Sequence, residues 1–177
     1  MSDRAGQARA LTIFTPIQPG AEPALRDYLR DMPRGASSPL ARSSRTHVGR
    51  WHIIDRLPPY EVPRQDELRR AHLLFSVSVD GDERSYLEQL TRMLAAEIPE
   101  LWGRCEGYPG LASSSAFVRW LLEHRVRTSF FFAAYSNATV DDVREALATR
   151  RQALAFALRA QDMEPTVRLA AFREEFP

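Results

Sequence analysis

A chain of 177 residues, 44% of them hydrophobic, is long enough to form one domain with a sizeable core. Its net charge of +1 provides no long-range attraction to nucleic acid or to an anionic membrane, so we expect neither as a partner. Lysine is absent and the 24 basic residues are all arginine, which excludes catalysis through a lysine Schiff base. The single cysteine, Cys105, excludes a disulfide within the chain.

Residues 1–9 are polar and contain no apolar stretch of the kind found in signal peptides. No segment approaches the roughly 20 apolar residues that a membrane-spanning helix requires. We therefore expect a flexible N-terminus on a cytoplasmic protein, with one domain at residues 10–163 and a C-terminal tail at residues 164–177.

One pattern occurs three times along the chain: an apolar run of strand length, a polar turn, and then apolar residues at helical spacing. The three strand–helix pairs are 11–17 with 19–32, 72–79 with 82–98, and 128–135 with 139–160. A further strand candidate, 47–55, lies between the first two pairs. This order predicts an α+β fold of the ferredoxin-like split βαβ type (β-α-β-β-α-β). An extra C-terminal helix follows, and the antiparallel sheet is covered by helices on one face only.

Apolar residues alternate in the first and third of these predicted strands, which is typical of strands with one buried face. In the first strand, Thr12 and Phe14 lie on the opposite face from Ile13 and Ile17. In the third strand, one face is apolar and should pack on the helices, while the other should lie on the exposed or partner-covered side. These two sets are Leu73, Phe75, Val77 and Val79, and His72, Leu74, Ser76 and Ser78.

Two other segments are distinctive in composition. Residues 56–70 form a long proline-containing connection between paired strands, and long loops are often functional. Residues 128–135 include three consecutive phenylalanines and are apolar on both faces, which predicts a strand that is central in the sheet or sealed at an interface.

The opening residues 11–29, LTIFTPIQPGAEPALRDYL, resemble the first strand and helix of the dimeric α/β-barrel superfamily, and are similar to antibiotic-biosynthesis-monooxygenase-like proteins. The resemblance implies two sheets packed face to face, usually across a homodimer, around a cavity. Members include small monooxygenases, polyketide cyclases, muconolactone isomerases and haem-binding peroxidase-like groups, so the fold alone does not determine the reaction. The chain differs from the smallest members at residues 56–70, at an insertion around residues 103–127, and in its final helix.

The segment 46–52, THVGRWH, has the highest density of chemically active side chains. If His47 and Trp51 face the open side of the sheet, they project into the cavity, and Arg50 lies on the opposite face unless a bulge at Gly49 redirects it. The imidazole of His47 can then act as a base near neutral pH or ligate haem iron. The alternative is a strand entering from a loop, with His47 at its surface end and Trp51 in an interface.

Two further groups of residues are candidates for a binding site. His72 and Ser76 share a strand face and can line a pocket with hydrogen-bonding groups, or they can simply face solvent. Tyr108 lies in the glycine-rich segment 103–110, which lacks the usual nucleotide-binding spacings and forms either a lid over the cavity or a turn-rich connection. Cys105 in the same segment is typical of an inert buried thiol.

We therefore expect a small-molecule enzyme of specialised metabolism that acts in a cavity of a homodimer by cofactor-free oxygenation, cyclisation or isomerisation. The expected catalytic residues are His47 and His72, and the expected substrate-binding residues are Trp51, Ser76, Arg50, Tyr108 and Phe14. No metal or cofactor is expected. One alternative is a haem protein with a histidine ligand. The other is a non-catalytic interaction module that uses the phenylalanine-rich strand and the last helix for assembly.

Overall fold

The computed structural model describes residues 3–56 and 68–176 of the chain. Most of the predicted connection at residues 56–70 therefore lies outside the described residues. The chain divides into two compact units, Met1–Val140 and Asp141–Pro177, rather than into a domain at residues 10–163 with a tail. The first unit contains every described strand, and the second contains two helices.

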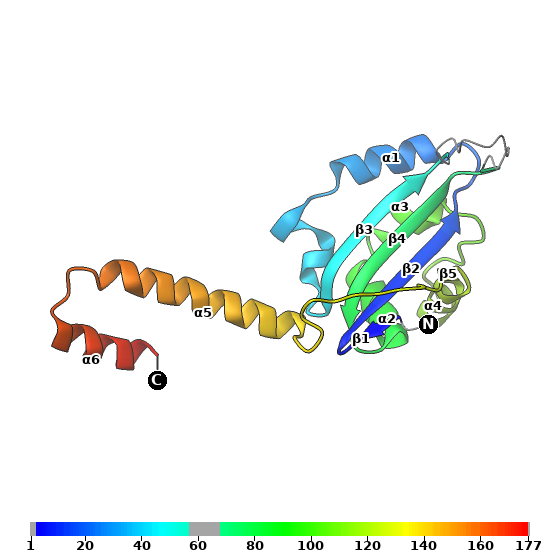
Figure 1. The fold of residues 1–177 in the computed structure, drawn as a ribbon. Helices are drawn as coiled ribbons and strands as arrows, with labels where there is room; N and C mark the ends of the chain where they lie inside the picture. The colour runs from blue at the N-terminus through cyan, green and yellow to red at the C-terminus, as the bar shows by residue number, and fades with distance from the viewer. Residues whose placement is uncertain (1–2, 57–67, 177) are drawn as a thin grey trace, which may run out of the picture. The chain divides into compact units, whose positions relative to one another are not determined.

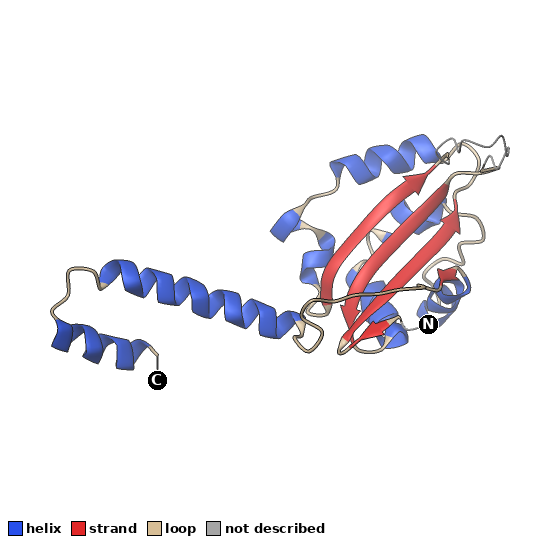
Figure 2. Ribbon diagram, in the orientation of Figure 1, coloured by secondary structure: helices blue, strands red, loops and turns tan. Residues whose placement is uncertain are grey.

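The first unit is built on an open antiparallel sheet (Figures 1 and 2). Its described strands are β1 (Arg4–Ala5), β2 (Ala8–Pro16), β3 (Thr46–Ile54), β4 (His72–Asp80) and β5 (Arg125–Val126). They are arranged in the order β1-β2-β4-β3, and β5 pairs with β2 beside β1. The predicted strands at residues 11–17, 47–55 and 72–79 are thus confirmed as the three long strands of the sheet.

Six α-helices accompany the sheet in the described residues. Four belong to the first unit, namely α1 (Glu22–Asp31), α2 (Glu83–Met93), α3 (Ile98–Leu101) and α4 (Ser114–Glu123). The second unit consists of α5 (Val140–Arg159) and α6 (Pro165–Glu175), apart from the first residue of α5. Among the described residues, no helix combines the length and the apolar content needed to cross a bilayer.

The core of the first unit lies between one face of the sheet and the helices. Leu73, Phe75 and Val79 of β4 are fully buried, as the predicted alternation requires. Helices α2 and α4 contribute Leu87 and Phe117, which are fully buried as well. Burial of each large apolar side chain contributes about 1.5–3 kcal/mol, so this layer provides most of the folding free energy. None of the described helices of this unit crosses the face of the sheet that is turned to the viewer in Figure 1.

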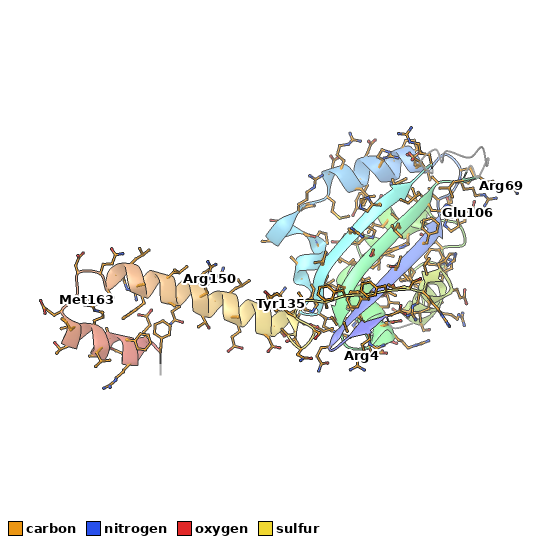
Figure 3. All side chains as sticks on the ribbon, viewed as in Figure 1. Arg4, Arg69, Glu106, Tyr135, Arg150 and Met163 are labelled. Carbon is orange, nitrogen blue, oxygen red and sulfur yellow. The ribbon has the colours of Figure 1, made fainter. Side chains whose placement is uncertain are left out.

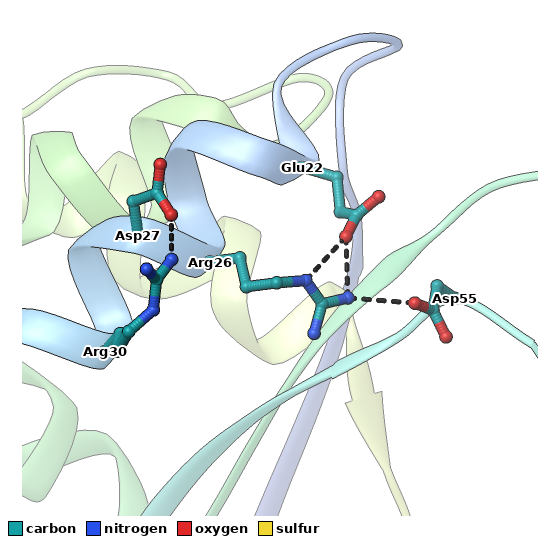
Figure 4. Close-up of polar contacts among 5 residues, drawn as sticks. All are labelled: Glu22, Arg26, Asp27, Arg30 and Asp55. Carbon is teal, nitrogen blue, oxygen red and sulfur yellow. Dashed lines mark hydrogen bonds and ion pairs between the residues drawn. The ribbon is translucent and has the colours of Figure 1, made fainter.

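Helix α1 is also connected to the end of β3 by charged side chains at the surface (Figure 4). The Arg26 guanidinium donates hydrogen bonds to Glu22 Oε1 at 2.6 and 2.9 Å and to Asp55 Oδ2 at 2.8 Å. One turn further along, Arg30 pairs with Asp27. These groups are exposed, so each pair contributes at most about 1 kcal/mol and the helix position depends mainly on its buried face.

Residues 128–135 do not form the predicted strand. The register of β5 against β2 pairs Ile13 with Arg125 and Thr12 with Val126, so a longer β5 would continue opposite Leu11 and Ala10 and then reach Arg9 and Ala8. That part of the edge of β2 is taken by β1, which pairs with Ala8 and Arg9. Because each backbone group in the ladder can pair only once, the chain beyond β5 leaves the edge of the sheet. It then crosses the face of the sheet that has no helices on its way to α5 (Figure 1).

Other contacts hold the departing segment. Thr128 donates its backbone N–H to Asp3 Oδ1 at 2.9 Å, and Gln7 donates its N–H to the Ser136 carbonyl at 2.6 Å. The turn between β1 and β2 lies against the same segment. Gly6 in this turn adopts a φ of 61°, and a Cβ at this position would lie 2.0 Å from the Ser136 carbonyl oxygen, so the close approach requires a glycine. Of the three consecutive phenylalanines expected to be covered, Phe130 and Phe132 are 81% and 73% exposed, whereas Phe131 is half-buried.

Asp80, the last residue of β4, connects three parts of the first unit. Its Oδ1 contacts His47 Nε2 at 2.7 Å, and its Oδ2 accepts the backbone N–H of Val140 at 2.8 Å. Its carbonyl oxygen accepts two hydrogen bonds from the Arg45 guanidinium at 2.6 and 2.8 Å. Asp80 is 8% exposed, so water competes little for these contacts.

Replacement of Asp80 by alanine removes the acceptor of both His47 and the Val140 amide. We expect the free energy of unfolding to fall by about 1–3 kcal/mol, because groups are left without partners in a largely dry site. Urea denaturation followed by circular dichroism measures this loss. The matched control is Asp27→Ala on the exposed surface of α1, for which we expect a change within about 0.5 kcal/mol. Equal stabilities of the two variants would contradict the anchoring role of Asp80.

Candidate functional site

The helix-free face of the sheet, which the segment after β5 crosses in Figure 1, carries side chains of the three long strands in regular rows. We call it the open face. The register places Ser76 of β4 between Thr12 of β2 and Arg50 of β3. Two residues along β4, Leu74 lies between Phe14 and His52. Side chains two residues apart on a strand point to the same face, so these rows share the open side. The face therefore combines a guanidinium, two hydroxyls, an imidazole and an aromatic ring.

Arg50 is the cationic group of this face. It is exposed, and within the described residues neither a hydrogen bond nor an ion pair engages its guanidinium. Ser76 and Thr12 follow it across the sheet and place two hydroxyl groups in line with it. A guanidinium with neighbouring hydroxyl donors is suited to binding a carboxylate or another planar oxyanion.

His72 begins β4 and stacks on Phe14, with ring centroids 4.3 Å apart and an interplanar angle of 4°. Its Nδ1 lies 2.9 Å from the Arg70 carbonyl oxygen. Because a carbonyl oxygen only accepts, Nδ1 is the donor, and an uncharged ring in this tautomer has its lone pair on Nε2. The stack and the hydrogen bond thus hold the imidazole in one orientation, and within the described residues no hydrogen bond engages Nε2.

His47 lies at the other end of the sheet. Strand β4 separates His72 from Asp80, the partner of His47, by roughly 26 Å at 3.3 Å per residue. The two histidines therefore do not meet in one pocket, although they were predicted to edge the same cavity. His47 Nε2 is engaged by Asp80, so Nδ1 is the nitrogen left for the haem iron of the alternative prediction. Within the described part of the chain, no three His, Cys, Asp or Glu side chains gather as a metal site.

The expectation that Trp51 faces the open side is wrong. Trp51 packs among the helices, with its ring 5.0 Å from Phe75 and 6.3 Å from Trp102 between centroids. An irregularity in β3 between Thr46 and Val48 makes His47 an extra residue relative to β4. In a regular strand His47 and Trp51 would point to the same face, but the extra residue breaks this relation. Arg50 lies on the open face, opposite Ser76, and Trp51 lies on the helix-covered face, opposite Phe75.

Tyr108 and Cys105 also lie on the helix-covered side. The ring of Tyr108 packs edge-on against Phe117 and Trp120 at 5.7 and 6.2 Å, and burial raises its pKa. Cys105 is fully buried, and its sulfur accepts a hydrogen bond from the Thr15 hydroxyl at 3.3 Å. Burial raises the pKa of the Cys105 thiol to about 11. Tyr108 is therefore part of the core rather than a lid over the open face.

A hollow of about 470 Å³ lies between the end of α1 and residues 36–42. Its lining includes Tyr28, Met32, Arg42 and Glu97. Arg42 and Glu97 already form an ion pair with each other, so neither charge is left uncompensated for a ligand. None of the predicted site residues lies there, and the open face remains the better candidate.

Four of the seven predicted site residues therefore share the open face: Phe14, Arg50, His72 and Ser76. Thr12 and His52, which were not among the predicted site residues, complete the rows on either side of β4. Both were visible in the alternation of residues along residues 11–17 and 47–55, since each lies an even number of positions from a residue of the open face.

Modification of Cys105 provides a test of the packing behind the sheet. A thiol with a pKa of about 11 is almost wholly protonated at pH 8, and the buried sulfur is inaccessible. We expect no reaction of the native protein with Ellman's reagent at pH 8, and one equivalent of reaction once urea unfolds the chain. Fast stoichiometric labelling without urea would contradict the burial of Cys105.

Comparisons of this chain with protein-family models, with curated proteins and with solved structures gave no match. The predicted membership of the dimeric α/β-barrel superfamily therefore stays a prediction.

Proposed function

We propose that the open face of the sheet binds a small planar organic acid and that His72 removes a proton from it. The bound anion then enters a cyclisation, an isomerisation or a cofactor-free oxygenation. A second copy of the chain covers the face, as in a dimeric α/β barrel. The observation that carries the proposal is the His72–Phe14 stack, with a free imidazole nitrogen, on the same face as Arg50 and its two hydroxyl neighbours.

The arrangement of the first unit supports a ferredoxin-like fold. Strands β5, β2, β4 and β3 follow one another across the sheet, and helices α1 and α2 come directly after β2 and β4 in the chain. This is the order of a split βαβ unit whose last strand is reduced to two residues. In such a fold the helix-free face needs a cover, and a second copy is the simplest one.

The spacing of the polar groups limits the ligand. Ser76 and His72 are four residues apart on β4, or about 13 Å along the strand. A ligand whose acidic group pairs with Arg50 must therefore extend along two or three rows before a C–H bond reaches His72. Fused aromatic or polyketide-like acids have this length and the flat shape that stacks on Phe14.

The chemistry required of the protein is modest. Arg50, Thr12 and Ser76 bind and orient the acid, and exclusion of water by the covering copy strengthens these polar contacts. The hydrogen bond from His72 Nδ1 to the Arg70 carbonyl stabilises the imidazolium that forms when Nε2 takes the proton. In this proposal the base and the anion site are both supplied by side chains of the chain itself.

Binding is tested by calorimetric titration with 2-naphthoate and anthraquinone-2-carboxylate, with the corresponding amides as uncharged probes. We expect the acids to bind more tightly than the amides, and Arg50→Ala to weaken acid binding about 10- to 100-fold, since a hydrogen bond to a charged group contributes about 1.5–3 kcal/mol. Arg26→Ala, which removes an arginine of α1, is the matched control and should leave affinity unchanged. Equal affinities of the Arg50→Ala and Arg26→Ala proteins would contradict the proposal.

Proton removal is tested with an enolisable ligand, 1-tetralone-6-carboxylic acid, in deuterated water. We expect the wild-type protein to speed incorporation of deuterium next to the ketone, and His72→Gln to remove most of this acceleration, since a positioned general base contributes about 10²–10⁴-fold. The exchange is followed by proton NMR, with His47→Gln as the control histidine substitution. Exchange that survives in His72→Gln but not in His47→Gln would assign the base to the other end of the sheet.

The interaction-module alternative is favoured by one observation. Phe130, Phe132 and Tyr135 are 81, 73 and 79% exposed on the segment that follows β5, and Tyr135 is labelled on this segment in Figure 3. Exposed aromatic residues in one segment are typical of protein contacts. Failure of all acids to bind the wild-type protein would favour this alternative.

A further inference from the structure

Helix α5 carries an apolar stripe that its own unit leaves uncovered. Helix α6 covers the other side of α5: Phe156 packs on Phe172 and Phe176, with ring centroids 5.7 and 5.8 Å away. Nearby, Gln152 Nε2 donates to the Glu175 carbonyl oxygen at 3.1 Å, and Arg159 pairs with Glu175 at 2.5 Å. At about 100° per residue, Gln152, Phe156 and Arg159 lie on one side of the helix.

The uncovered stripe lies roughly opposite. Four side chains fall within an arc of about 60° on the other side of α5, since they are separated by four, seven and four residues. They are Val143, Leu147, Leu154 and Leu158, with exposed fractions of 37, 50, 52 and 69%. Helix α6 cannot reach them while it remains packed on Phe156. We call these four residues the α5 stripe.

The second unit is too small to leave such a stripe in water. Chains below about 40 residues seldom form a sufficient core without a disulfide, a metal ion or association with another chain. The unit Asp141–Pro177 is of this size, and the only cysteine of the protein lies outside it. Val167, Leu169 and Phe172 of α6 are also about half exposed. A further layer is needed, and association is the route that this sequence leaves open.

We propose that the α5 stripes of two copies of this chain pack against each other in an antiparallel pair. The spacing of four, seven and four residues is the same in both directions along the helix. An antiparallel pair centred between Arg150 and Arg151 therefore places Val143 opposite the partner's Leu158 and Leu147 opposite the partner's Leu154. Such a self-complementary surface is what a two-fold symmetric interface requires.

The charges of α5 favour the same direction of pairing. Asp141, Asp142 and Glu145 make the beginning of the helix acidic despite Arg144, whereas Arg150, Arg151 and Arg159 make its second half basic. An antiparallel pair brings the acidic part of each copy to the basic part of the other, and a parallel pair brings like charges together. Antiparallel helix dipoles add to this preference.

Arg150 and Arg151 do not block the centre of the pair. Each lies about 50° to one side of the middle of the stripe, one on either flank. Figure 3 labels Arg150 on the exposed helix. The aliphatic stems of arginines in this position cover the edges of an apolar contact while their guanidinium groups stay in water.

Cysteine cross-linking tests the register. We expect the double variant Leu147→Cys with Leu154→Cys to form a disulfide-linked dimer on mild oxidation, visible on a non-reducing gel at twice the 20.2 kDa of the chain. Each single variant should stay monomeric on the gel, because residue 147 and its symmetry mate lie about 10 Å apart along the axis, beyond disulfide reach. Cys105 is buried and does not compete.

The matched control is Ala148→Cys with Ala155→Cys, which keeps the spacing of seven residues but lies well to one side of the stripe. The proposal is overturned if this control cross-links as readily as the stripe variant, if the single variants cross-link equally well, or if the stripe variant gives no dimer. A dimer held only through the sheet face would give no cross-link between the α5 helices. Absence of the cross-link therefore contradicts the α5 pairing without bearing on the proposed function, which is tested by ligand binding and deuterium exchange.

Charge insertion provides an independent test. In sedimentation experiments at matched concentration, Leu147→Glu with Leu154→Glu should shift the protein toward lower mass. Ala148→Glu with Ala155→Glu should leave the mass of the wild type unchanged. Circular dichroism of both variants establishes that α5 remains helical. A wild-type mass equal to that of the stripe variant overturns the proposal.

Discussion

Competition for one edge of β2 determines much of this structure. Each residue on that edge can pair with one neighbouring strand only. The short strand β1, which precedes β2 in the chain, pairs with Ala8 and Arg9, so these positions are not available to the strand that follows α4. Strand β5 is consequently limited to two residues opposite Thr12 and Ile13. The phenylalanine-rich segment that follows leaves the sheet and exposes aromatic side chains, although its composition is that of a buried strand.

The alternation of side chains along β2, β3 and β4 determines which groups lie on each face of the sheet. It sends the apolar residues toward the helices and leaves a mixed set of hydroxyl, imidazole, guanidinium and aromatic groups on the other face. None of these groups is held by the core, so their positions follow from the register and from local contacts such as the His72–Phe14 stack. A site on regular strands is more rigid than one on loops, because the ladder fixes the spacing of its members.

Much of the first unit was predictable, because its strands and helices have strong periodicity. The three long strands, the helix after each turn, and the faces of β2 and β4 follow from that signal alone. Strand β1 was not predictable, since Arg4 and Ala5 carry no pattern, and the missing strand at residues 128–135 follows from it. The site was half predictable. Phe14, His72 and Ser76 follow from alternation, whereas Trp51 and His47 were misplaced by one extra residue in β3 that no composition signal reveals.

The carboxylate of Asp80 has a mechanical consequence. The N–H that it accepts belongs to Val140, the last residue of the first unit, and its other oxygen and its carbonyl contact the start of β3 through His47 and Arg45. Tension applied to the chain beyond Val140 is therefore transmitted directly to the joined ends of β3 and β4. The hydrogen bond from the Val140 N–H to Asp80 Oδ2 is the contact that carries this tension into the sheet.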